Sequence, residues 1–398
     1  MEQVDVFIAG GGLAGLVAAA AFGQAGFSVV LADPSSPPEA GTSTGADLRA
    51  TAYLRPSRDL IAQSGLWSAL EPHATPLEVL RIIDTVGWPP ETRETRDFRA
   101  DDMGEVSFGW NLPNWHARAV LARAIEGLPQ VSLRFGVGFR SLVSRDAEAV
   151  VTLEDGTRLR ARLAIAADGR GSTLRDAAGI GVQTTRYGQK ALAFAVSHPE
   201  PHGRISTEIY NEGGAFTLVP GSDIDGRPAS SVVWMNRGAR ALELQAMEKA
   251  EFESVMNIRS CGILGPLSLE SKRQLWPVTT QHARILSSGR VALIAEAAHV
   301  MPPIGAQGLN TSLRDVAVLI ELALKTPNDL GSKAMLSAYR ARRSGDVGAR
   351  LAAIDLFNRV CMSGDSSVQL LRLAGLRAVH GIAPLRQAVM RAGLGTTS

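Results

Sequence analysis

The chain has 398 residues, of which 45% are hydrophobic and 20% are charged, as in a globular enzyme of about two domains. Aromatic residues make up 5% and the net charge is +2, which argues against a nucleic-acid partner. The two cysteines, Cys261 and Cys361, lack metal-ligand spacing, so we expect no metal site. A strand begins by residue 4 and no run of about 18 apolar residues occurs, so we expect a cytoplasmic protein without a signal or transmembrane segment.

The N-terminal segment predicts a βαβ unit. Residues 4–9 form a short apolar run typical of a buried parallel strand, and residues 13–24 form an alanine-rich helix. Residues 27–32 predict a second strand, which ends at Asp33. A glycine-rich loop with the spacing Gly-x-Gly-x-x-Gly joins the first strand to the helix, and its glycines are Gly10, Gly12 and Gly15.

This loop predicts a dinucleotide site. Gly10 permits the tight turn, Gly12 lets the backbone approach a diphosphate, and Gly15 lets the helix pack closely on the strand. The helix begins with Leu13 and Ala14, where free backbone N–H groups and the helix dipole hold phosphates. The carboxylate that ends the second strand can accept hydrogen bonds from a ribose. The pattern alone does not distinguish FAD from NAD.

Two later segments also point to a ligand site. Asp168 and Gly169 follow a buried strand and precede a helix, which places them at the carboxyl end of a strand, where open α/β sheets bind ligands. Glu296 ends another strand, and a Pro/Gly loop then leads into a helix that starts near Leu309. The start of that helix can stabilise negative charge on a reduced flavin ring. His299, between them, is a candidate catalytic residue, although a structural loop histidine is the simpler interpretation.

The three segments, in this order, resemble the class A flavoprotein aromatic hydroxylases with the p-hydroxybenzoate hydroxylase fold. Those enzymes carry GxGxxG, then GADGxxSxxR, then GDAAHxxxPxxGQGxN, and the resemblance spans nearly the whole chain. Within that superfamily the chain is most similar to the ubiquinone-biosynthesis hydroxylases. The stretches that carry this similarity are residues 47–52, 187–191, 201–202, 208–210 and 386–393.

The resemblance implies an α/β fold in an α+β two-domain arrangement. It would combine a Rossmann-like FAD-binding domain with an inserted antiparallel β-sheet substrate domain and C-terminal helices. We interpret residues 84–105, which carry dense charge without a clean period, as an excursion at a domain edge. The expected division is an FAD-binding domain over 1–75, 101–182 and 284–330, a substrate domain over 76–100 and 183–283, and a C-terminal helical region over 331–398.

The resemblance also implies the cofactor contacts. Besides the N-terminal loop, the residues implied to contact FAD are Asp33, Arg49, Asp168, Glu296, Pro303, Gly305, Ala306, Gln307, Gly308, Leu309 and Asn310. Pro303 joins His299 as a candidate catalytic residue, and the segment at Asp168 is implicated in NAD(P)H use in relatives. Because no second GxGxxG lies on a strand-to-helix turn, we expect NAD(P)H to bind transiently or a reductase partner to supply the electrons.

The chain departs from the family pattern around the expected flavin. Alanine replaces glycine at Ala166, Ala295 and Ala306, Ser312 replaces another glycine, and Glu296 replaces aspartate. Alanine is strained where φ is positive. We therefore expect FAD binding to be loosened or repositioned but not abolished.

The function implied is an FAD-dependent monooxygenase that hydroxylates the aromatic ring of a polyprenylated ubiquinone precursor. Reduced flavin would capture O₂ as a C4a-hydroperoxide and transfer one oxygen atom to the ring. Substrate contacts are expected from residues 216–220, Trp234 and the loop near Pro303, and no catalytic base can be named. Two alternatives stay open: a flavin-dependent reductase of a prenyl lipid, and a non-catalytic subunit of a quinone-biosynthesis complex.

The charge is unevenly distributed along the chain. From Lys333 onward there are ten basic and three acidic residues, a net charge of +7. This excess favours contact with an anionic membrane surface or a partner complex, although solvated arginines on helices would give the same count. A polyprenylated substrate also favours peripheral association with the inner membrane. Nothing in the sequence specifies the oligomeric state.

Overall fold

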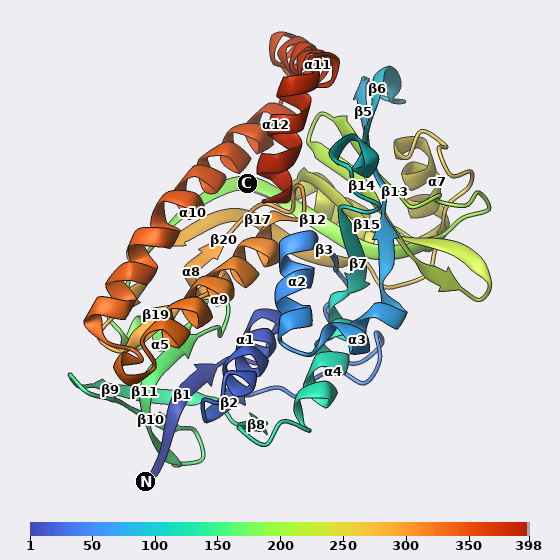
Figure 1. Cartoon of the computed structure of the whole chain (residues 1–398). Helices are drawn as coiled ribbons and strands as arrows, with labels where there is room; N and C mark the ends of the chain where they lie inside the picture. Colours follow the sequence, from blue (N-terminus) through green and yellow to red (C-terminus); the bar gives the residue numbers. More distant parts are fainter. Residues whose placement is uncertain (396–398) are drawn as a thin grey trace.

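A mainly parallel sheet carries the glycine-rich loop in the computed structural model, which describes residues 1–395 (Figure 1). Its strand order is β18 (Ser287–Ser288), β19 (Val291–Leu293), β11 (Arg158–Ala166), β1 (Glu2–Ala9), β2 (Val29–Asp33) and β8 (Val131–Phe135). The central strand β1 runs parallel to both neighbours, β11 and β2. Two further strands extend the sheet by antiparallel pairing, β10 (Ala149–Leu153) with β11 and β9 (Phe139–Ser144) with β10.

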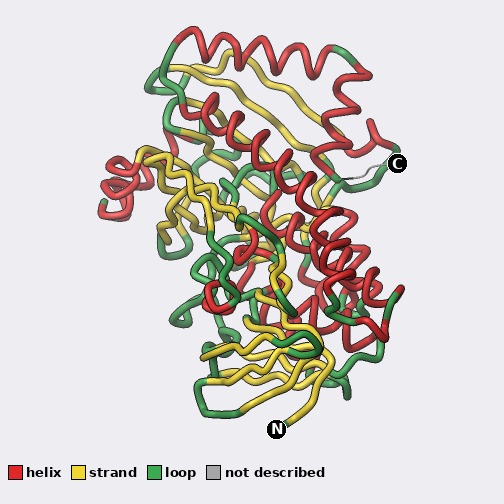
Figure 2. Tube along the Cα trace, turned by 90° about the vertical axis from the view of Figure 1, so that its left-hand side faces the viewer, coloured by secondary structure: helices red, strands yellow, loops and turns green. Residues whose placement is uncertain are grey.

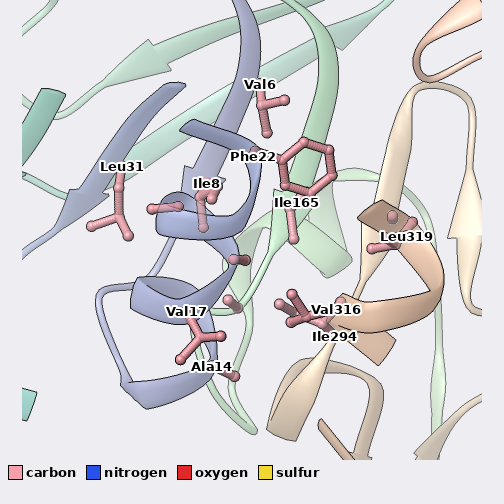
Figure 3. Close-up of a cluster of buried hydrophobic side chains, with 14 of the residues drawn as sticks. Val6, Ile8, Ala14, Val17, Phe22, Leu31, Ile165, Ile294, Val316 and Leu319 are labelled. Atoms are coloured by element: carbon pink, nitrogen blue, oxygen red, sulfur yellow. The ribbon is translucent and has the colours of Figure 1, made fainter. Parts of the chain in front are cut away.

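The core of this region lies on β1 and the helix that follows it. Helix α1 (Leu13–Gln24) is apolar on every side and almost entirely buried, as expected of a helix enclosed by a sheet and other helices. Figure 3 shows Val6 and Ile8 of β1 close to Phe22 of α1, with Val316 of helix α9 (Gln307–Lys325) in the same cluster. This packing fixes the direction in which α1 leaves the glycine loop.

A second, nine-stranded sheet forms the other half of the molecule. Its order is β20 (His299–Val300), β17 (Gln274–Ala283), β12 (Val182–Ser197), β15 (Arg227–Arg237), β14 (Gly214–Ile224), β13 (Ile205–Asn211), β5 (Val79–Val86) and β6 (Glu91–Arg99), with β16 (Ser268–Leu269) paired to β12. Neighbours pair antiparallel except β13 and β5. One face packs against α6 (Gly238–Ala246) and α7 (Lys249–Arg259).

The helix-covered face holds two residues that were expected to contact substrate. Phe216 and Trp234 stack edge to face, with 5.4 Å between ring centroids, and lie in one buried cluster with Phe252 of α7. Their neighbours in sequence, Thr217 and Val233, point to the opposite face, because side chains alternate along a strand. The substrate contact expected of Phe216 and Trp234 is therefore wrong.

Residues 84–105, which were expected to form an excursion at a domain edge, include most of a regular hairpin of β5 and β6 at the edge of the second sheet. Charged side chains occupy its edge strand and pair with neighbours: Arg81 with Asp97 at 2.8 Å, and Arg377 of the C-terminal region with Glu94 at 2.5 Å. Because these positions carry charged residues, the sequence lacks the alternation of apolar and polar residues by which a strand is recognised. Charge on an edge strand also discourages edge-to-edge association.

The remaining elements surround the two sheets. A three-stranded sheet has the order β3 (Ala50–Leu54), β7 (Gly109–Pro113) and β4 (Thr75–Leu77). The helices not yet named are α2 (Arg55–Gln63), α3 (Trp67–Leu70), α4 (Asn114–Ile125), α5 (Thr173–Ala177), α8 (Ala295–Ala298), α10 (Lys333–Met362), α11 (Ser366–Gly381) and α12 (Ala383–Leu394). Short 3₁₀ turns cover Glu71–His73, Ala100–Met103 and Pro327–Asp329.

Helix α10 ties the two large sheets together. Near its start the Tyr339 hydroxyl donates to the Leu293 carbonyl, at 2.7 Å, and near its end the Asn358 amide donates to Gln189 on β12, at 2.9 Å. Figures 1 and 2 show this long helix running along one side of the molecule before α11 and α12. Within residues 1–395, no helix combines the length and hydropathy needed to span a bilayer. The domain boundaries given above stay a prediction.

Candidate active site

A single cavity of about 640 Å³ extends from the glycine loop to the second sheet. Its walls come from the start of α1, from β3, from residues 302–309, from the open face of the second sheet and from α12. Segments far apart in sequence therefore meet around one space. Most of its lining is apolar.

The three motif glycines have different roles in the structure. Gly10 has a φ of +105°, and a Cβ there would lie 2.3 Å from the Ala167 carbonyl oxygen. A Cβ on Gly15 would lie 2.0 Å from the Gly10 carbonyl oxygen. A Cβ on Gly12 would meet no atom within 4 Å, yet Gly12 lines the cavity. Gly10 and Gly15 are thus required by the fold, whereas Gly12 leaves open the space where a diphosphate would approach α1.

Asp33, at the end of β2, fixes the glycine loop by hydrogen bonds. Its carboxylate accepts the backbone N–H groups of Gly11 and Ser35, each at 2.7 Å. Arg118 on α4 lies 3.4 Å from Asp33 and donates to the Gly11 carbonyl at 2.8 Å. Arg118 lines the cavity but was not predicted, because its place in an ordinary helical pattern gives no signal.

A chain of charges lines the same cavity beyond the glycine loop. Arg49 pairs with Asp47 at 2.7 Å and lies 3.9 Å from Glu296, and Arg170 lies 3.6 Å from the other oxygen of Glu296. The Arg49 guanidinium stacks on Trp276, 4.3 Å from the ring centroid. Burial acts to lower the pKa of Arg49, but hydrogen bonds and charge from Asp47 outweigh it and the pKa is raised. These groups can bind the polar, hydroxyl-bearing part of a dinucleotide.

The loop at residues 303–310 is fixed on both sides. The Asn310 amide donates to the Ala52 carbonyl at 2.8 Å, and its oxygen accepts the Leu54 N–H at 2.9 Å, which ties α9 to β3. Gln307 accepts from Arg350 on α10 at 2.7 Å and donates to the Gly393 carbonyl on α12 at 2.8 Å. The first residues of α1 and of α9 line the same cavity. The N-terminus of a helix favours negative charge, so both helices favour an anionic ligand there.

Asp168 has its carboxylate turned toward its own helix. It accepts the Ser172 hydroxyl and, at 3.1 Å, the Leu174 backbone N–H at the start of α5. The cavity is lined instead by the neighbouring Ala167 and Gly169. The cofactor contact expected of Asp168 stays a prediction.

His299 lies in a buried network. Its Nε2 is 2.7 Å from an oxygen of Asp315 on α9, and the other oxygen of Asp315 accepts from Arg343 on α10 at 2.8 Å. All three side chains are buried. This environment favours a positioning role for His299. A catalytic role for His299 or Pro303 stays a prediction.

The residues that depart from the family pattern occupy either left-handed or ordinary backbone positions. Ala295 has a φ of +55° and Ala306 a φ of +54°, the left-handed region in which alanine is strained. Ala306 immediately precedes α9 as its N-cap. Ala166 is an ordinary residue of β11, where alanine fits without strain. Glu296 follows the strained Ala295, so the altered residues lie together at the expected flavin end.

The FAD-binding domain family matches residues 3–352, which is most of the chain. The chain belongs to the FAD-dependent monooxygenases. It is 34% identical to the ubiquinone hydroxylase UbiL of Rhodospirillum rubrum, over 99% of this chain and 90% of that protein. It is 27% identical to the 3-demethoxyubiquinol 3-hydroxylase of Escherichia coli, over 99% of each.

The fold of this monooxygenase is also seen in solved structures. p-Nitrophenol 4-monooxygenase PnpA from Pseudomonas putida DLL-E4 superposes with a TM-score of 0.80 at 20% identity, over 100% of both chains. PqsL of P. aeruginosa, solved with 2-aminobenzoylacetate, superposes with a TM-score of 0.75 at 19% identity, over 91% of this chain and 98% of that one. The predicted α/β fold and the FAD cofactor are thereby confirmed.

Substitution of Gly12 by alanine tests whether the glycine loop binds the diphosphate of FAD. We call this part of the cavity the FAD cradle. Because the new methyl group meets no protein atom, we expect Gly12→Ala to fold with a stability within about 0.5 kcal/mol of wild type. FAD affinity should fall at least about tenfold, since the second motif glycine allows backbone approach to the diphosphate. Flavin fluorescence titration and thermal unfolding measure the two effects. Gly15→Ala is the matched control, which should lose stability itself; equal FAD affinity in Gly12→Ala and wild type would contradict the assignment.

Substitution of Ala306 by glycine tests the backbone strain. Relief of the left-handed conformation should stabilise the apoprotein by about 0.5–1 kcal/mol, as measured by urea unfolding. The same change at Ala166, where the backbone is an ordinary strand, should destabilise by a similar amount. A loss of stability in both variants would show that Ala306 is not strained.

Proposed function

We propose that this monooxygenase hydroxylates the aromatic ring of a polyprenylated quinone precursor, with O₂ as oxygen source and NAD(P)H as electron donor. The observation that carries the proposal is the continuity of the FAD cradle with an apolar chamber in one cavity. The relatives named above are, by their names, a ubiquinone hydroxylase and a 3-demethoxyubiquinol 3-hydroxylase. Bound FAD would supply the activated oxygen, while the protein holds the ring and excludes water.

The chamber suits an apolar ring with a hydrocarbon tail. We call it the apolar chamber and define it by residues of the second sheet that line the cavity: Leu80, Ile82, Ala191, Ala193, Thr217, Val219, Val233 and Val278. At the opposite wall, α12 contributes Val389, Met390 and Leu394. A prenyl chain could therefore leave the chamber beneath α12.

Two alternatives compete with this proposal. The family comparison favours oxygen transfer over reduction of a prenyl lipid, because the named relatives are hydroxylases. The intact cradle at Gly12, with Arg49 and Glu296 facing the same cavity, favours an enzyme over a non-catalytic subunit. Electron supply by a reductase partner and membership of a quinone-biosynthesis complex stay predictions.

The mass of the product separates hydroxylation from reduction. Protein loaded with FAD, given NAD(P)H and a short-chain prenylated phenol under ¹⁸O₂, should yield a product heavier by one ¹⁸O atom. Reduction would instead add two hydrogen atoms and proceed without oxygen. The Gly12→Ala variant serves as the control with a weakened cofactor site. A product formed under argon at the same rate would overturn the proposal.

We also propose that α11 and α12 rest on the membrane that holds the substrate. Exposed apolar side chains cluster on these helices, namely Leu370, Leu371, Ile382, Leu385 and Val389. Arg391 is exposed beside them and suits an anionic leaflet. Val389 is both exposed and part of the cavity wall, so the surface and the substrate route adjoin.

Vesicle binding tests this surface. The double variant Leu371→Ser/Leu385→Ser should co-sediment with vesicles containing anionic lipid at least about tenfold more weakly than wild type, because each buried leucine contributes about 1.5–3 kcal/mol. Leu324→Ser, at an equally exposed leucine near the end of α9, is the matched control and should bind as wild type does. Equal binding by the double variant and wild type would rule the surface out.

A further inference from the structure

One carboxylate lies in the apolar chamber, away from the charges near the cofactor. Glu208 on β13 lines the cavity and is only 8% exposed. Strand pairing places it in a row across the sheet with cavity-lining Ile82, Thr217, Val233 and Ala193, none of which carries a charge. Glu208 is thus the acidic group in an otherwise apolar floor.

Glu208 differs from the other carboxylates of the cavity in its partners. Asp47 and Glu296 each lie within 4 Å of an arginine, whereas within residues 1–395 no such ion pair involves Glu208. Its partner is the hydroxyl of Tyr210, two residues further along the same strand, which donates to Glu208 Oε2. A carboxylate without a positively charged partner in an apolar site is costly unless it is hydrogen-bonded.

Tyr210 is a buried donor on the same face of the sheet as Glu208, beside the cavity. It packs in a cluster with Ala191, Met235 and Cys361, and it does not line the cavity. Burial and the charge of Glu208 raise the pKa of Tyr210 well above its ordinary value, so the phenol keeps its proton and remains a donor. A carboxylate has about four acceptor positions, and the Tyr210 hydroxyl together with the Gly305 backbone N–H leaves capacity for a group within the chamber.

The surroundings of Glu208 suit a proton acceptor. Burial raises its pKa, while the Tyr210 hydroxyl and the Gly305 backbone N–H act in the opposite direction. Gly305 belongs to the loop that leads into α9, so this carboxyl connects the sheet to that loop. A base is most effective when its pKa lies near the working pH, and burial moves an acid toward that range.

We propose that Glu208 is the catalytic base that binds the ring hydroxyl of a phenolic substrate and takes its proton, with Tyr210 as its positioning residue. The inference rests on the proposed hydroxylation. The phenolic O–H bond breaks, an O–H bond forms on Glu208, and the electron pair stays on the ring oxygen. The ring becomes more electron-rich at the carbon that accepts oxygen. The oxygen atom and the electrons still come from O₂ and NAD(P)H.

Replacement of the carboxyl by an amide tests the acid–base role. Glu208→Gln keeps the size and an acceptor for Tyr210 but cannot take a proton, so product formation near neutral pH should fall about 10²-fold. The loss should shrink as pH rises, because the phenol then ionises without help. Glu243→Gln on the exposed face of α6 is the control and should match wild type. An unchanged rate and pH profile in Glu208→Gln would overturn the proposal.

Tyr210→Phe distinguishes positioning from a merely structural role. Loss of a donor to the carboxylate raises the pKa of Glu208 further, so the acidic limb of the pH–rate profile should move to higher pH. The rate above that limb should stay near the wild-type value. A uniform fall at every pH would indicate damage to the fold instead and count against the role.

A binding measurement separates this inference from the reaction. 4-Nitrophenol absorbs visible light when ionised, so a spectrum reports its protonation in the oxidised FAD-loaded protein. At a mildly acidic pH, wild type should ionise the bound phenol and Glu208→Gln should not. Equal spectra for the two proteins overturn the role of Glu208. Ionisation by wild type together with a reduced, oxygen-free product would instead overturn the proposed function alone.

Protein stability gives an independent check on the fold of the variant. An acid whose pKa is raised by folding binds more protons in the folded state than in the unfolded state. The loss of folding stability that it causes is therefore absent below its unfolded pKa and grows as the pH rises to the folded pKa. Glu208→Gln should therefore unfold at the same temperature as wild type at low pH and at a higher temperature at alkaline pH. A variant less stable at every pH would show that Glu208 serves the fold.

Discussion

The contacts of one buried carboxylate, Asp315, hold together the end of the site where the flavin is expected. It accepts from His299 and from Arg343, and the Ala295 backbone N–H lies 3.3 Å away. Those contacts join the start of α8, strand β20, helix α9 and helix α10. Removal of one partner from a buried ion pair costs about 3–5 kcal/mol, so the arrangement is strongly specified. The position of Glu296, one residue after Ala295, follows from this arrangement.

The two ends of the cofactor site differ in how the backbone is used. At the glycine loop, left-handed or crowded positions carry glycine, as at Gly10 and Gly15. At the other end, Ala295 and Ala306 occupy left-handed positions despite their side chains. Such strain persists only where the surroundings determine the conformation, and it clusters at functional sites. The neighbours of Asp315 and the two hydrogen bonds of Asn310 to β3 provide those surroundings.

The sequence allowed some features to be predicted and concealed others for physical reasons. The βαβ unit was predictable because its signals are local: an apolar run, a glycine loop and an acid at fixed spacing. The hairpin of β5 and β6 was not, because its charges find partners such as Arg377, far along the chain. Arg118 and the chamber position of Glu208 also depend on tertiary pairing. For Glu208, the similar stretch at 208–210 marked the residues but gave them no role.

Helix α12 is at once part of the cavity wall and part of the molecular surface, and it is hydrogen-bonded to the start of α9 through Gln307. With this helix on a bilayer, a prenylated ring would pass from lipid to chamber without crossing bulk water. The quantity that saturates the enzyme would then be the mole fraction of substrate in the lipid, and its concentration in the aqueous volume would have little meaning. Dilution of the membrane with inert lipid would slow turnover even though the total amount of substrate is unchanged.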